Sequence, residues 1–140
     1  MKKLLVAILA LGTLSSASAF AIHYSWTDFE LNQRVMLNLT GFSSTEDASQ
    51  AAVATIADIE AGNLMGVNKK MRYIGADDDC RDLWNNRTAQ AVGEFIARRG
   101  QYAKVSMGFT LATSYDSQGN PSVTAKLGGR IPCLAPQDDD

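Results

Sequence analysis

The sequence predicts an α+β fold, in which an antiparallel sheet with a long C-terminal hairpin is covered by two helices. Two segments near the C-terminus alternate apolar with small or polar residues, as strands with one buried face do. Two segments in the middle of the chain repeat apolar residues at helical spacing. A sheet with one apolar face needs a cover, and amphipathic helices supply it.

The N-terminal segment, residues 1–19, has the three zones of a secretory signal peptide. Lys2 and Lys3 precede an apolar run from Leu4 to Leu14, and Ala17-Ser18-Ala19 offers the small residues that signal peptidase accepts. We expect cleavage after Ala19, with a cut after Ala21 as the alternative. The apolar run is shorter than the roughly 20 residues that a membrane span requires, so no span is expected after cleavage. The short charged start is typical of bacteria and predicts a periplasmic or secreted protein.

The processed chain is expected to form one α+β domain over residues 20–136, followed by an acidic tail at 137–140. Cleavage after Ala19 leaves 121 of the 140 residues, a length typical of one domain. Removal of Lys2 and Lys3 leaves 11 basic side chains against 15 acidic ones, a formal charge of −4. Nucleic-acid binding depends on basic contacts to phosphate, so no nucleic-acid partner is expected.

The first elements after the leader are expected to be strands. Residues 20–26 place four large apolar side chains on one face, namely Phe20, Ile22, Tyr24 and Trp26. The stretch 28–40 fits either a helix or a strand, because Thr27 and Glu30 have capping-box spacing while apolar residues alternate from Val35 to Leu39. We favour a strand over 34–40, since a glycine and two serines follow it as a loop signal.

Two helices are expected in the middle of the chain. The first begins near Ser43, which has capping-box spacing to Glu46, and ends at Gly62. Its apolar residues are Ala48, Ala51, Ala52, Val53, Ile56 and Ile59. The second is expected to be capped by Asp78 or Asp79 and to end before Gly100. Its apolar stripe comprises Leu83, Trp84, Ala91, Val92, Phe95 and Ile96.

The last two strands are expected to form the long hairpin. Apolar residues alternate over 105–111 and again over 123–131. Between these strands, Asp116 to Asn120 contain the glycine and asparagine that tight hairpin loops favour. We therefore interpret this oxygen-rich segment as a turn rather than a cation site.

The two cysteines, Cys80 and Cys133, are the only ones in the chain. An even count in an exported protein predicts one disulfide, and the spacing fits no zinc or redox motif. The bridge would connect the start of the second helix to the end of the last strand.

Candidate catalytic and metal-binding residues are few. His23 is the only histidine, and no nucleophile motif accompanies it, so it is interpreted as a surface residue. Four carboxylates, Asp77, Asp78, Asp79 and Asp82, could offer oxygen ligands to Ca²⁺, but helix capping explains them without a metal. No catalytic residue, cofactor or metal site is therefore predicted.

One hairpin face is the best candidate for binding, because small residues there would let a partner approach the backbone closely. It comprises Ser106, Gly108 and Thr110 on one strand and Lys126 and Arg130 on the other. The preferred hypothesis is non-catalytic binding of another protein or a cell-envelope component. The alternatives are a carboxylate-based hydrolase that uses Asp77 to Asp82, and an envelope subunit that assembles through exposed strand edges. The sequence leaves the oligomeric state open.

Overall fold

The computed structural model describes residues 25–74 and 85–135. The leader, most of the strand predicted at 20–26, His23, the Asp77 to Asp82 cluster, Cys80 and the acidic tail lie outside these residues. The elements are η1 (Trp26–Asp28), β1 (Phe29–Phe42), α2 (Thr45–Ala61), η2 (Asn68–Lys70), β2 (Arg72–Tyr73), α3 (Asn86–Arg99), η4 (Gly100–Ala103), β3 (Ser106–Tyr115) and β4 (Pro121–Leu134).

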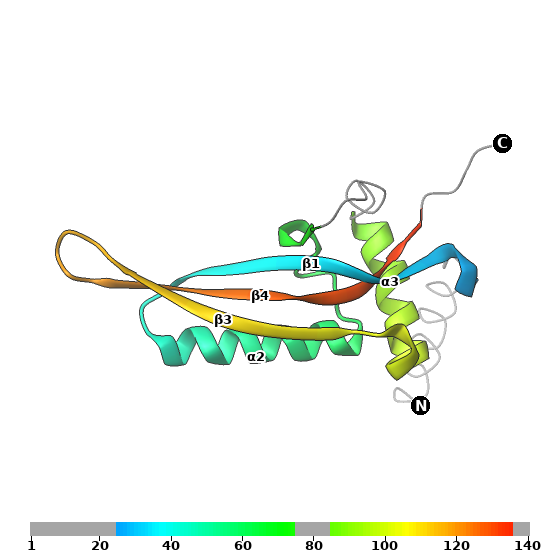
Figure 1. Ribbon diagram of the computed structural model, residues 1–140, viewed down its shortest axis with the longest axis horizontal. Helices are drawn as coiled ribbons and strands as arrows, with labels where there is room; N and C mark the ends of the chain where they lie inside the picture. Colours follow the sequence, from blue (N-terminus) through cyan, green and yellow to red (C-terminus); the bar gives the residue numbers. More distant parts are fainter. Residues whose placement is uncertain (1–24, 75–84, 136–140) are drawn as a thin grey trace, which may run out of the picture.

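The sheet has four antiparallel strands in the order β2-β1-β4-β3. Helix α2 packs on β1, β4 and β3, and α3 packs on β4 and α2. Figure 1 shows α2 running along the β3-β4 hairpin, whose tip extends beyond the first turn of the helix. The predicted α+β class, with an antiparallel sheet and two helices, is confirmed.

The first described strand differs from the prediction at its start. Trp26 belongs to η1 rather than to a strand, because the Asp28 carboxylate accepts a hydrogen bond from the Ser25 backbone N–H at 2.7 Å and turns the chain. β1 then runs through Phe42, which confirms the strand interpretation of 34–40 and extends it. A register shift against β4 interrupts β1 between Glu30 and Gln33.

Helix α2 begins one residue later than the capping pattern predicted. The cap is Ser44 rather than Ser43, and its hydroxyl oxygen accepts a hydrogen bond from the Asp47 N–H at 3.1 Å. Gly62 ends the helix as predicted, with a left-handed φ of 87° that favours glycine.

Helix α3 begins later than predicted, because its cap is Asn85 and not Asp78 or Asp79. The Asn85 side chain accepts a hydrogen bond from the Thr88 N–H at 3.0 Å, and Asn85 has the extended backbone angles of an N-cap residue. The C-terminal part of the predicted stripe is buried, namely Ala91, Val92, Phe95 and Ile96. Leu83 and Trp84 lie outside the described residues.

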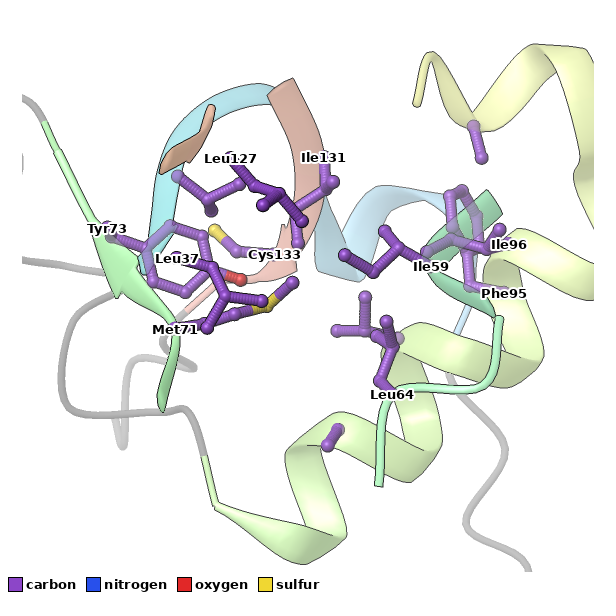
Figure 2. Packing of buried hydrophobic residues seen from close by; sticks show 14 of the residues in the cluster. Leu37, Ile59, Leu64, Met71, Tyr73, Phe95, Ile96, Leu127, Ile131 and Cys133 are labelled. Atoms are coloured by element: carbon purple, nitrogen blue, oxygen red, sulfur yellow. The ribbon is translucent and has the colours of Figure 1, made fainter. Parts of the chain in front are cut away.

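The core lies between the helices and one face of the sheet. Figure 2 shows Leu37, Leu127 and Ile131 of the sheet opposite Ile59 of α2 and Phe95 and Ile96 of α3. Phe29 stacks on Phe95 with ring centroids 4.1 Å apart, and Trp26 lies against the same ring. The helices approach closely at Gly62 and Gly93, where a Cβ on either residue would overlap the carbonyl oxygen of the other.

Candidate binding face

The five residues predicted as a binding face lie on one exposed face of the β3-β4 hairpin. Across the ladder, Ser106 is opposite Arg130 and Thr110 is opposite Lys126. Gly108 is opposite Gly128, so the middle of this face has no side chains. All five predicted residues are exposed, whereas the alternate residues of β4 are buried under the helices.

Strands β1 and β2 extend this surface beyond the hairpin. Arg34 is opposite Arg130, Asn38 is opposite Lys126, and Arg72 is opposite Met36. We call the combined surface the outer face. It comprises Arg34, Met36, Asn38, Arg72, Ile74, Ser106, Gly108, Thr110, Lys126, Gly128 and Arg130.

Sequence reasoning missed the contribution of β1 and β2 to the outer face. The alternation of 34–39 gives two faces to the strand, so it could have placed Arg34, Met36 and Asn38 together. It could not show that β1 lies beside β4, because strand order depends on contacts between distant segments of the chain.

Among the residues that the structure describes, four cations gather on the outer face with no carboxylate directly opposite them. Arg34, Arg72, Lys126 and Arg130 have no acidic residue among their directly opposed cross-strand neighbours. Arg34 and Arg130 are opposite each other, an arrangement of like charges that destabilises an antiparallel pair. Helix α2, which covers the other face, carries four acidic residues and no basic one. The outer face and helix α2 therefore differ in the sign of their charge.

The outer face is shallow rather than enclosed. Two adjoining hollows of about 340 Å³ each share Ile74 and Gly128. Ile74 is 45% exposed, and its backbone N–H donates to the carbonyl oxygen of Arg34 at 2.8 Å, which holds it beside β1. Met36 also contributes to one hollow, so apolar side chains lie among the cations.

A third hollow, of about 470 Å³, lies where the end of α2 meets α3 and is lined by Asp58 and Glu94 among others. The described residues contain no group of three or more metal-ligating side chains, so this hollow offers no metal centre. Its carboxylates are two among mainly small and apolar residues, and no buried polar set converges on it.

Two described side chains have displaced pKa values, and both are displaced away from neutrality. Burial raises the pKa of the Tyr73 hydroxyl further above its ordinary value. The Asn120 backbone N–H and further donors of the turn lower the pKa of Asp116. Neither group is suited to acid-base catalysis near neutral pH.

The hydrolase candidates, Asp77 to Asp82, and one of the two cysteines, Cys80, lie outside the described residues. Cys133 is buried in the part of the core that also holds Leu37, Met71 and Tyr73 (Figure 2). The Cys80–Cys133 bridge stays a prediction, and so does any role of Asp77 to Asp82.

No protein family, curated protein or solved structure matches this chain. The helices of the described residues are all too short or too polar to cross a membrane. Fold and surface together define the molecule as an α+β protein with a cationic, shallow outer face.

Proposed function

We propose that this protein acts by non-catalytic binding in the bacterial periplasm or outside the cell, and that its outer face holds an acidic protein partner. The observation that carries the proposal is a set of four cations, Arg34, Arg72, Lys126 and Arg130, which have no directly opposed carboxylate in the described strands. Their strands also carry the half-buried Met36 and lie beside the exposed Ile74.

The chemistry of the outer face favours a protein over a small molecule. Small-molecule sites are concave and enclose their ligand, whereas these hollows are shallow. Arginine and methionine are enriched at protein interfaces, and three of the four cations are arginines.

Charge complementarity favours an acidic partner. The whole chain has a formal charge of −2, so the cationic outer face is a local exception to an acidic protein. A partner with carboxylates at matching positions would relieve the repulsion between Arg34 and Arg130 and would be steered to this face.

The test is site-specific photo-cross-linking in cells that export the full-length protein. A photoreactive side chain at Asn38 on the outer face is expected to give a discrete protein adduct, and the same group at Ala54 on exposed α2 is the positional control. Arg34→Glu combined with Arg130→Glu should abolish the adduct, because both substitutions turn attraction into repulsion. Arg87→Glu combined with Arg98→Glu, both exposed on α3, is the charge-matched control and should leave the adduct intact.

Two outcomes would overturn the proposal. An adduct at Asn38 that persists in the double charge reversal would show that the cations do not carry the binding. Purified protein that binds anionic phospholipid vesicles, with no protein adduct at Asn38 in cells, would replace the acidic protein by a membrane surface.

A further inference from the structure

Strand β3 forms one edge of the sheet that the described residues make. It is the last strand in the order β2-β1-β4-β3, and among residues 25–74 and 85–135 only β4 pairs with it. Its register with β4 is continuous from Ser106 opposite Arg130 to Tyr115 opposite Pro121, without a bulge.

The hydrogen bonds of the turn show which backbone groups of β3 are unpaired. The Asp116 N–H donates to the Asn120 carbonyl oxygen at 3.0 Å, so these two residues form a hydrogen-bonded pair. Hydrogen-bonded and non-hydrogen-bonded pairs alternate along an antiparallel ladder. The residues of β3 in non-hydrogen-bonded pairs are therefore Met107, Phe109, Leu111, Thr113 and Tyr115. Their N–H and C=O groups point away from β4, and Pro121, which has no N–H, fits its place opposite Tyr115.

The residues of β3 itself carry none of the features that usually prevent strand addition. Natural edges are protected by charged side chains, proline, bulges or short length. β3 has ten residues and contains neither proline nor a charged residue. The cations of the hairpin are Lys126 and Arg130, which lie on the inner neighbour β4. Leu111 is 36% exposed and Tyr115 is 71% exposed, so apolar surface lies along the same edge.

We propose that β3 of a second copy of this chain pairs antiparallel with β3, around a two-fold axis at Thr110. This pairing joins the two four-stranded sheets into one. In this register Thr110 faces Thr110 of the other copy, and Phe109 faces Leu111. The outer faces of the two sheets then lie on the same side. In each Phe109–Leu111 pair, the N–H and C=O groups of both residues point away from β4, so they can form hydrogen bonds between the two copies. On the outer side the pairs are Gly108 with Ala112 and Ser106 with Ser114, which are small enough to lie opposite one another.

The charge distribution permits self-pairing along this edge. Lys126 lies beside Thr110, so the two copies of Lys126 would be separated by three strand spacings. At about 4.8 Å per spacing this is about 14 Å, more than the Debye length of about 8 Å at physiological ionic strength. No like charges would face each other across the new strand pair, and two outer faces would form one continuous surface.

The test is sedimentation velocity on protein purified after expression of the full sequence, from low micromolar to several hundred micromolar. The wild type is expected to shift from monomer to dimer as its concentration rises. Thr113→Pro should stay monomeric, because it removes an N–H that points to the open edge and leaves the β3–β4 bonds intact. Thr113→Val keeps this N–H and should dimerise like the wild type.

A second variant covers the case in which the proline disturbs the hairpin. Thr110→Lys would place two ammonium groups opposite each other at the two-fold axis, so it should weaken dimerisation at least tenfold and more at low salt. Thr110→Gln is its neutral control, and circular dichroism should show the same fold for all variants. A wild type that is monomeric at every concentration, or a folded Thr110→Lys that dimerises as strongly as the wild type, would overturn the proposal.

Discussion

At the scale of single residues, Asp116 shows how one side chain sets the geometry of a turn. Its carboxylate oxygen Oδ1 accepts hydrogen bonds from the backbone N–H groups of Gln118 and Asn120, at 2.9 and 2.8 Å. Gly119 takes a φ of 80°, which allows the chain to return into β4. The sequence predicted a turn here because glycine and asparagine are residues that tight hairpin loops favour.

Asp116 predicts a pH-dependent contribution to stability. Hydrogen bonds lower its pKa in the folded state, so the contribution is present above the ordinary aspartate pKa of about 3.9 and is lost as the pH falls through the lowered value. Asp116→Asn should therefore lower the thermal midpoint at neutral pH, and the difference from the wild type should vanish in strong acid. Thermal unfolding over a pH series measures it. A difference that stays constant from neutral pH to strong acid would contradict this cause.

Gly93 is required by the contact between α2 and α3. A Cβ on Gly93 would overlap the carbonyl oxygen of Gly62, so Gly93→Ala should destabilise the protein by about 1–3 kcal/mol despite the better helix propensity of alanine. Urea unfolding measures the change. Gly66→Ala is the matched control, because a Cβ there meets no atom within 4 Å. Equal stability of the two variants would refute the close contact.

The burial of Asn68 could not be predicted from the sequence. It is buried, and its Nδ2 donates to Oδ1 of Asn86 at 2.9 Å, which ties the loop after α2 to the first residue of α3. An isolated asparagine in a polar loop gives no sign of burial, since its partner lies far along the chain.

At the scale of elements, periodicity predicted most of what the structure contains. The hairpin strands and both helices follow from alternation and helical spacing. The first residue of each helix was predicted less accurately than its apolar stripe. The start depends on which of several polar side chains accepts a hydrogen bond from the first turn of the helix. Both helices begin later in the chain than predicted, α2 by one residue and α3 by several.

The start of α2 gives a direct test of its cap. Ser44→Ala should destabilise the protein by about 1 kcal/mol, because the Asp47 N–H loses its acceptor. Ser43→Ala should have little effect, although Ser43 has the capping-box spacing to Glu46. Urea denaturation of both variants compares the two serines directly. A larger loss for Ser43→Ala would place the cap where the sequence pattern first predicted it.

At the scale of the whole molecule, the arrangement of charge was not visible in the sequence. Arg34, Arg72, Lys126 and Arg130 come from three segments of the chain, and only the order β2-β1-β4 brings them to one face. The small residues of β3 and two of these cations could be predicted, because a hairpin fixes which residues share a face.

The disulfide hypothesis belongs to the same scale, since it joins distant segments. If Cys80 and Cys133 are bridged, Cys80→Ser should lower the thermal midpoint markedly, because a closed loop of this length stabilises by about 4 kcal/mol in the chain-entropy model. Adding a reductant to the wild type should lower its midpoint in the same way and should leave the variant unchanged. Two titratable thiols in the unfolded, non-reduced wild type would rule out the bridge.

The sequence by itself determined the α+β class, the long hairpin, its turn and the small-residue face, because these depend on local periodicity and on residues close along the chain. The tertiary structure decided the strand order, the cationic outer face, the contact of Gly62 with Gly93 and the open edge of β3. These features depend on which strands and helices lie side by side. Local sequence patterns are compatible with several such arrangements, and tertiary packing selects one of them.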